Sequence, residues 1–228
     1  MNTKDAIKKR RSIRSYNGKA VEFEKVTKII EAGMYAPSSG ELKDTVYIML
    51  TDQHKISKLS ERCKQQYWMA QAPVIILVCA NEEKCEELYG LRGKRLYSIQ
   101  NSAAAIQNMM LRATSLKLST CWVGNFDENY VKDEFDIPDT HRPQGILTIG
   151  YSDEKQEEQK NFKMEGRVFF ETFGNKIKDY AAFTNRYGKR VEEKVNKFDR
   201  KIQNKTNKAQ STLRERFKQL KERLTKNK

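Results

Sequence analysis

Three short segments of the sequence carry the side chains best suited to chemistry. The first is RRSIR at 10–14, in which three arginines and a serine lie within five residues. Guanidinium groups bind phosphate oxygens in bidentate geometry, and a serine hydroxyl adds a further donor. Arg10, Arg11, Ser12 and Arg14 therefore form a candidate phosphate site. Their composition is equally typical of a solvated basic face or of a segment that binds nucleic acid.

The other two segments are loops rich in small residues. In APSSGE at 36–41, Pro37 ends a helix, and the serines and glycine after it leave N–H and hydroxyl groups able to bind the edge of a planar heterocycle. A plain helix-ending turn is the alternative interpretation. In CWVGNF at 121–126, Gly124 follows a strand and allows a ligand to approach the backbone closely, whereas Trp122 is more typical of a core residue.

The sequence offers little for metal or acid–base chemistry. Its four cysteines form no CxxC pair and its two histidines are scattered, so we expect no metal site. There is no P-loop, no GxGxxG after a strand, and no triad that His54 or His141 would serve. If the protein is an enzyme, its chemistry then belongs to a bound cofactor. Cys79 and Cys121 lie in apolar segments, and we expect them to be buried and reduced, as in a cytoplasmic protein.

Positive charge is concentrated at the end of the chain. The 228 residues carry a formal net charge of +14, from 44 Lys and Arg against 30 Asp and Glu. Residues 189–228 hold 15 basic and 5 acidic residues, a net charge of +10, which leaves +4 for the rest. The longest apolar run, 72–80, is too short to span a bilayer and suits a buried strand. The basic N-terminus has no apolar stretch behind it, so we expect no secretory signal.

Hydrophobic periodicity predicts an alternation of helices and strands, which is typical of an α+β or α/β fold. Helices are predicted at 3–9, 22–35, 52–62, 95–118 and 127–135, and strands at 45–50, 73–80, 144–151 and just before Gly124. Thr3 is the expected cap of the first helix. The helix at 95–118 has so little polar face that we expect it at the centre of the fold.

The segment from about 190 to 226 has a pattern of its own. It contains neither Pro nor Gly, and its apolar residues recur at near-heptad spacing, which predicts a long basic amphipathic helix. Such a helix could pair as a coiled coil, pack along its own dimer, lie on an anionic membrane or bind nucleic acid. We therefore expect a main domain over 1–188 and a helical tail over 189–228.

Six segments, taken in order, resemble the FMN-dependent nitroreductase family across residues 4–188. They are RRSIRSY, EKVTKIIEAGMYAPSSGE, AQAPVIILVCA, SIQNSAAAIQNMMLRATSLKLSTCWVGNFDE, IPDTHRPQGILTIGY and GRVFFETF with a later NRYG. The resemblance implies an α+β nitroreductase-like fold, with a mostly antiparallel central sheet flanked by helices and FMN sites at a homodimer interface. It also implies hydride transfer from NAD(P)H through flavin N5 to a small electron acceptor, such as a nitroaromatic or a quinone. That ping-pong cycle needs no catalytic acid or base.

The resemblance further implies a set of cofactor contacts, matched position by position. Phosphate and ribityl contacts fall on Arg10, Arg11, Ser12 and Arg14, and contacts to the isoalloxazine of the partner chain fall on Pro37, Ser38 and Ser39. An amide contact falls on Gln65 or Gln66, and contacts beside flavin N5 and the pyrimidine edge fall on Cys121, Trp122, Val123 and Gly124. Arg167 matches a late basic residue near the phosphate, and Lys163 is a weaker candidate.

The sequence departs from the family pattern at three positions. Glu41 and Lys43 stand where Asn and Gln are usual, and Asn101 stands where many relatives carry Asp. An acidic Glu41 close to a flavin could lower its potential, repel anionic substrates, point to solvent or pair with Lys43. The physiological acceptor and the preference for NADH or NADPH stay open. The rival hypothesis is a binding or scaffold protein with a flavin fold, whose basic tail does the work.

Overall fold

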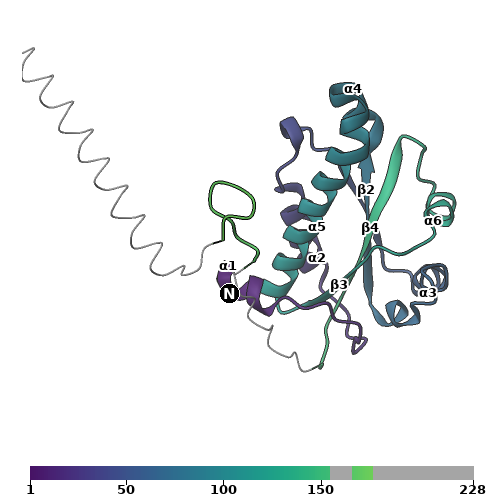
Figure 1. Cartoon of the computed structure of the whole chain (residues 1–228). Coiled ribbons are helices and arrows are strands. Elements are labelled where there is room, and N and C mark those ends of the chain that lie inside the picture. Colours follow the sequence, from purple (N-terminus) through teal and green to yellow (C-terminus); the bar gives the residue numbers. More distant parts are fainter. Residues whose placement is uncertain (155–165, 177–228) are drawn as a thin grey trace, which may run out of the picture. The chain divides into compact units, whose positions relative to one another are not determined.

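A four-stranded antiparallel sheet lies at the centre of the main body of the protein (Figure 1). Every neighbouring pair of strands is antiparallel, and the two outer strands of the sheet are β1 and β3. The spatial order is β1-β2-β4-β3, with bounds β1 (Thr45–Leu50), β2 (Val74–Asn81), β3 (Ser119–Val123) and β4 (His141–Gly150). The strands predicted at 45–50, 73–80 and 144–151 are confirmed to within three residues.

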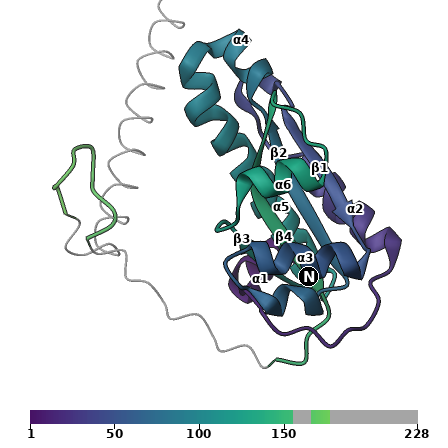
Figure 2. The same ribbon diagram turned by 90° about the vertical axis from the view of Figure 1, so that its right-hand side faces the viewer.

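Helices cover both faces of this sheet. α2 and α5 pack on one face, whereas α3 and α6 pack on the other, where Figure 2 views them from the front. The described α-helices are α1 (Thr3–Lys9), α2 (Phe23–Met34), α3 (Gln53–Arg62), α4 (Glu82–Arg92), α5 (Ser98–Ser115) and α6 (Glu128–Glu134). This three-layer arrangement is the α+β class that the alternation of helices and strands predicts.

The core forms because β2 carries apolar side chains on both of its faces. Ile75 and Leu77 pack in the cluster that includes α3 and α6, and Ile76 and Val78 pack in the cluster that includes α2 and α5. Successive side chains of a strand point to opposite faces of the sheet. A strand without polar alternation must therefore be covered on both sides, and all four of these residues are fully buried.

α5 is the central helix that its low polarity predicts. Its residues Ile106 and Met109 are fully buried against the sheet and α2. The predicted helix at 95–118 begins instead with a π-helical turn, Gly93–Tyr97, from which α5 continues. Gly93 is needed in this turn, because a Cβ atom there would lie 2.0 Å from the carbonyl oxygen of Cys85.

Two local features differ from the sequence predictions. Hydrophobic periodicity does not predict α4, because its sequence EEKCEELYGLR has almost no apolar face. The helix is started by Asn81, whose side-chain oxygen accepts a hydrogen bond from the N–H of Lys84 at 2.9 Å. The predicted cap of α1 is wrong by one residue: Asn2, not Thr3, caps the helix by accepting from the N–H of Asp5 at 2.9 Å.

The structure describes residues 1–154 and 166–176, as a computed structural model. The chain divides into two units, Met1–Lys160 and Asn161–Lys228. Within the described ranges, no helix combines the length and the apolar character that crossing a membrane requires.

The described part of the second unit is a short turn. Phe169 pairs with Lys176 across it, and the rings of Phe169 and Phe173 lie 4.7 Å apart. The predicted boundary between 188 and 189, the predicted basic helix and Lys163 all lie outside the described residues.

The burial of β2 predicts the effect of a truncation there. Leu77→Ala should lower the free energy of unfolding by about 2–5 kcal/mol, because Leu77 is fully buried and its loss leaves a cavity. Leu88→Ala is the matched control: Leu88 is 59% exposed on α4, and its truncation should change stability little. Urea unfolding followed by circular dichroism measures both, and equal losses would contradict this account of the core.

Candidate functional site

The arginine-rich segment lies along the free edge of β3. After α1 ends, the chain runs extended, and Ser12 forms a parallel bridge with Thr120 of β3. The N–H of Ile13 donates to the carbonyl of Thr120 at 3.0 Å, and the side chain of Ile13 is buried. The edge of the sheet therefore fixes the position of the candidate phosphate residues.

Tyr16 holds this segment in register from inside the core. Its hydroxyl donates to the carbonyl of Ile13 at 3.0 Å and lies 2.6 Å from the hydroxyl of Thr148 on β4. Thr148 in turn accepts from the N–H of Cys121 at 3.2 Å. Burial raises the pKa of Tyr16 well above its usual range, so the hydroxyl stays protonated. A single buried network therefore joins the arginine segment to β3 and β4.

Two of the arginines raise the positive potential around Cys121, in the middle of β3. Arg14 and Arg10 both act to lower the pKa of Cys121, although burial outweighs them and the net pKa is raised. The guanidinium of Arg14 lies 5.7 Å from the ring centroid of Trp68, within the range of a cation–π contact. Arg14 forms no ion pair with any carboxylate of residues 1–154 or 166–176.

The glutamine pair and the glycine turn lie beside each other. The side-chain amide of Gln66 donates to the carbonyl of Cys63 at 2.9 Å and to that of Asn125 at 3.2 Å. These bonds join the loop after α3 to the loop after β3, and Gln65 precedes them in a left-handed conformation with φ 60°. A Cβ atom added at Gly124 would meet nothing within 4 Å, so open space lies beside this backbone.

The residues of β3 itself alternate between the two faces of the sheet. Cys121 and Val123 are buried, and Val123 packs on the side of α3 and α6. Trp122 points to the opposite face and is 36% exposed, so the expectation of a core residue is wrong for it. Its indole nitrogen would lie 2.5 Å from a Cβ added at Gly145 of β4, two residues from its register partner Leu147, so only a glycine fits beside the indole there.

The serine loop, residues 36–41, lies at the other edge of the sheet. It leads into β1, whereas the arginine segment pairs with β3. In the order β1-β2-β4-β3 these edges are three strand spacings apart, or about 14 Å. A single chain therefore does not bring Pro37, Ser38 and Ser39 to the arginines. The other predicted segments, 10–14, 65–66 and 121–124, do lie together.

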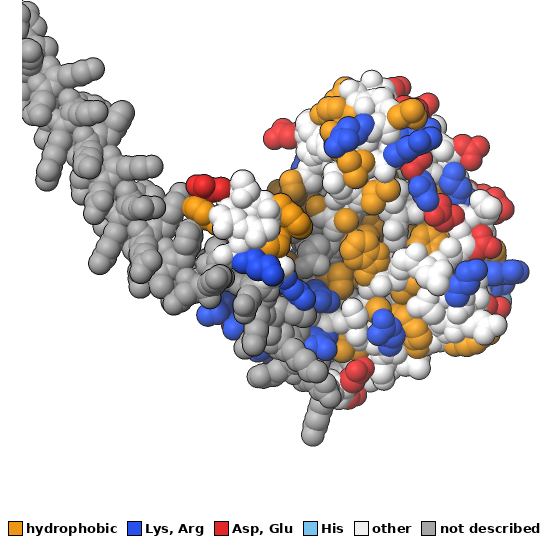
Figure 3. Space-filling model, in the orientation of Figure 1, with side chains coloured by type: hydrophobic (Ala, Val, Ile, Leu, Met, Phe, Trp, Pro, Cys, Tyr) orange, Lys and Arg blue, Asp and Glu red, His pale blue; other side chains and the backbone are white. Residues whose placement is uncertain are grey.

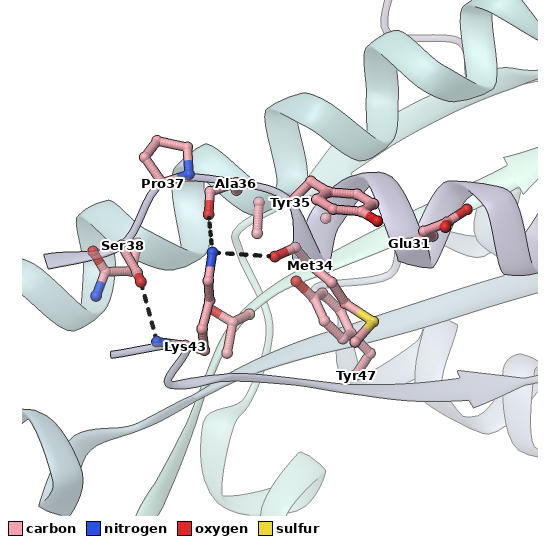
Figure 4. A pocket seen from close by; sticks show the side chains of 12 residues that line it. Glu31, Met34, Tyr35, Ala36, Pro37, Ser38, Lys43 and Tyr47 are labelled. Atoms are coloured by element: carbon pink, nitrogen blue, oxygen red, sulfur yellow. Dashed lines mark hydrogen bonds between the residues drawn. The ribbon is translucent and has the colours of Figure 1, made fainter. Parts of the chain in front are cut away.

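A cavity of about 780 Å³ lies behind the serine loop, between the end of α2, β1 and α5 (Figure 4). Lys43 lines this cavity and donates its ammonium hydrogens to the carbonyls of Ala36 at 3.0 Å and Met34 at 3.4 Å. Met34 is the last residue of α2 and Ala36 follows it, so the ammonium lies at the helix C-terminus, where the helix dipole favours a cation. The proposed pairing of Lys43 with Glu41 is not what these contacts show: Lys43 caps α2 instead.

Large apolar side chains stay exposed on the helical layer formed by α2 and α5. Phe23 and Met34 of α2 are 66% and 61% exposed, and Ile99 of α5 is 41% exposed. Figure 3 shows apolar side chains gathered in the middle of one face of the first unit.

Arg167 is exposed in the second unit, whose position relative to the first is not described.

The comparison with known proteins decides the family. The model of the nitroreductase family matches residues 7–68 and 57–151, which is more than half of the chain. The chain belongs to the nitroreductase family. The predicted resemblance is confirmed, and with it the class of NAD(P)H-dependent oxidoreductases to which the sequence assigned the protein.

Solved structures support the fold of this nitroreductase. A nitroreductase family protein from Clostridium difficile 630 is 30% identical, with a TM-score of 0.67 over 76% of this chain and 100% of its own. An FMN-dependent nitroreductase from Clostridium difficile R20291 is 29% identical, with a TM-score of 0.65 over 74% of this chain and 98% of its own. The FMN reductase [NAD(P)H] of Bacillus subtilis is 26% identical over 200 residues, which cover 82% of this chain and 80% of that protein.

The residues at the β3 edge of this nitroreductase fit an FMN molecule by their chemistry. Guanidiniums and the hydroxyl of Ser12 match a phosphate dianion, and Arg14 has no carboxylate partner among the described residues. The open space at Gly124 leaves room for a flat ring against the backbone. Within the described ranges, no three His, Cys, Asp or Glu side chains gather as they would around a metal ion.

Burial of the cysteines predicts their reactivity. Cys63, Cys79, Cys85 and Cys121 are all buried, and burial raises the pKa of the first three to about 12 and that of Cys121 in the same direction. Because the thiolate is the reactive form, native protein at pH 8 should react with Ellman's reagent very slowly. Protein in guanidinium chloride should release all four thiols at once. A fast-reacting thiol in the native protein would contradict the described packing.

Proposed function

We propose that this nitroreductase binds FMN and transfers a hydride from NAD(P)H through flavin N5 to a small electron acceptor, such as a nitroaromatic or a quinone, in a ping-pong cycle. The observation that carries this proposal is the β3 edge, where the arginine segment, Gln66 and the open backbone at Gly124 lie together. Relatives named FMN reductase and FMN-dependent nitroreductase support it.

The side chains would bind and orient, and they would supply no acid or base. Bound FMN supplies the hydride chemistry. Arg10, Arg11 and Arg14 would hold its phosphate dianion through charge-assisted hydrogen bonds, with Ser12 as a further donor. Cys121 to Gly124 would approach the ring through their backbone, because the thiol of Cys121 is buried and its pKa is raised.

We further propose a homodimer in which each site takes its arginines from one chain and its serine loop from the other. The distance of about 14 Å between the two sheet edges supports this division, since one chain alone leaves the loop away from the arginines. The exposed apolar side chains of α2 and α5 support a second copy of the chain as the cover of the helical layer.

The rival function, a binding or scaffold protein that acts through its basic tail, depends on residues 189–228. Those residues lie outside the described ranges, so no structural observation favours nucleic acid, a membrane surface or a coiled-coil partner for them. A cytoplasmic location stays a prediction, which the free, buried cysteines support.

The proposed function is tested on the purified full-length chain. FMN fluorescence should be quenched and saturate as protein is added, because the flavin leaves water for a folded site. NADH or NADPH should then be oxidised in the presence of FMN and a quinone or nitroaromatic, with the parallel double-reciprocal lines of a ping-pong cycle. A protein that neither quenches FMN nor oxidises either nicotinamide would overturn the proposal.

Arg14 offers a sharper test of the phosphate site. Arg14→Ala should weaken FMN binding by roughly 10- to 150-fold, because a hydrogen bond to a charged group contributes about 1.5–3 kcal/mol. Arg14→Lys should fall between, since it keeps the charge and loses the bidentate geometry. Arg92→Ala is the matched control: Arg92 lies 5.6 Å from the Tyr97 ring, on α4, and its loss should leave the FMN dissociation constant unchanged. Equal losses from Arg14 and Arg92 would count against the site.

A further inference from the structure

A buried hydrogen-bond chain holds the serine loop from beneath. Asn101 of α5 is only 5% exposed. Its side-chain oxygen accepts from the N–H of Ser39 at 3.0 Å and from the Ser39 hydroxyl at 3.3 Å. Its side-chain nitrogen donates to a carboxylate oxygen of Asp44 at 2.8 Å. One amide therefore ties the middle of the loop to the residue that precedes β1.

Asp44 completes this chain as a buried carboxylate. It is 2% exposed, and within the described part of the protein it forms no ion pair. Its second oxygen accepts from the thiol of Cys85 at 3.1 Å, and its backbone carbonyl accepts from the N–H of Asn81 at 2.8 Å. A buried charge of this kind is costly unless it is hydrogen-bonded, so the amide of Asn101 is part of what keeps Asp44 in place.

The hydrogen-bonding groups of Ser39 and Asp44 determine which residue type can link them at position 101. The N–H of Ser39 can only donate, and both side-chain oxygens of Asp44 accept, one from Asn101 and the other from the thiol of Cys85. A side chain that satisfies both must offer an acceptor and a donor on neighbouring atoms, which is what an amide does. An aspartate at position 101 would accept well from Ser39 and would set its other oxygen against Asp44.

The backbone of the loop needs such an anchor. Gly40, Glu41 and Lys43 all adopt left-handed conformations, with φ of 56°, 57° and 50°. Non-glycine residues in this region cost free energy, and they persist where surrounding contacts hold them. Asn101 holds the loop at Ser39, and the ammonium of Lys43 holds its start at Ala36.

The two serines are left with different roles by these contacts. Ser39 donates both its N–H and its hydroxyl hydrogen to the side-chain oxygen of Asn101. The Ser38 hydroxyl accepts from the N–H of Lys43 at 3.0 Å, and the described residues offer its own hydrogen no acceptor. Ser39 is therefore the anchored residue, and Ser38 is the residue that keeps a donor for a ligand.

We propose that Asn101 and Asp44 are positioning residues of the flavin site, which hold Ser39 so that Ser38 faces the flavin of the partner chain. The inference rests on the proposed function. The pairing of one amide with one carboxylate beneath the loop, however, makes a prediction that is independent of the proposed function. Exchanging the two residue types should preserve every hydrogen bond, whereas changing one alone should break the chain.

The test compares three variants with the wild-type chain. Asn101→Asp sets two carboxylates against each other and should release the loop. In the double variant Asn101→Asp with Asp44→Asn, the carboxylate introduced on α5 accepts from Ser39 and from the amide introduced before β1, and the oxygen of that amide accepts from Cys85. Asn108→Asp is the matched control, because Asn108 is on the same helix and its side chain donates to the carbonyl of Ala32 at 3.2 Å.

Two measurements are made on each variant. Hydrogen exchange of the peptide over 36–43, with no flavin added, should speed up about tenfold in Asn101→Asp and return close to the wild-type rate in the double variant. The FMN dissociation constant should rise about tenfold in Asn101→Asp and return close to the wild-type value in the double variant. Asn108→Asp should move neither quantity, and thermal melting shows that each variant is folded. If Asn101→Asp does not fold, Asn101→Ser replaces it, since serine is too short to span Ser39 and Asp44 together.

Each outcome decides the proposal. Failure of the double variant to restore slow exchange would overturn the amide–carboxylate pairing. Restored exchange with an FMN affinity that never moved would overturn the role toward the flavin and leave a structural one. If the wild-type chain binds no FMN, the proposed function fails, and the role toward the flavin fails with it. The exchange data would then still report on the loop by themselves.

Discussion

The candidate site depends on a short stretch of backbone pairing at the edge of the sheet. An edge strand presents unpaired N–H and C=O groups, and β3 offers them to the segment that follows α1. Because side chains alternate along an extended segment, burying Ile13 turns Ser12 and Arg14 outward. The hydroxyl of Tyr16 then locks this register from the core. A one-residue slip would bury a guanidinium and expose an isoleucine, so the hydrophobic core itself selects which residues face the ligand.

The order of the strands places the serine loop and the arginine segment, which the proposed FMN site needs together, at opposite edges of the sheet. With β1 and β3 at opposite edges, the serine loop and the arginines cannot meet within one sheet. In the proposed homodimer, a second copy of the chain would supply the serine loop, because two-fold symmetry would pair each loop with the other chain's arginines. On this view assembly and cofactor binding are one property. The exposed apolar residues of α2 and α5 would then lie at the dimer interface that forms the proposed site.

Much of the fold follows from local sequence, and the parts that do not are those set by tertiary contact. Strand β2 is predicted because its apolar run is unbroken, and α5 because its polar face is narrow. Helix α4 escapes prediction, since its start depends on the Asn81 cap more than on an apolar face. The residue types of the arginine segment indicate a phosphate ligand, yet its pairing with Thr120 joins residues far apart in the chain. The hydrogen bond from Ser39 to Asn101 likewise joins residues 62 positions apart, so no local sequence pattern predicts it.

The departures from the family pattern at Lys43 and Asn101 change the hydrogen bonds that anchor the serine loop to the rest of the protein. The ammonium of Lys43 donates to the carbonyls of Met34, the last residue of α2, and of Ala36, at the helix end where the dipole favours a cation. Asn101 binds the middle of the same loop through a neutral amide, which suits the carboxylate of Asp44 behind it. Glu41 lies between these two anchors, and its backbone path is determined by them. Substitutions at 43 and 101 therefore change the groups that anchor the serine loop at the β1 edge, whereas the arginine segment is held separately, by its pairing with β3.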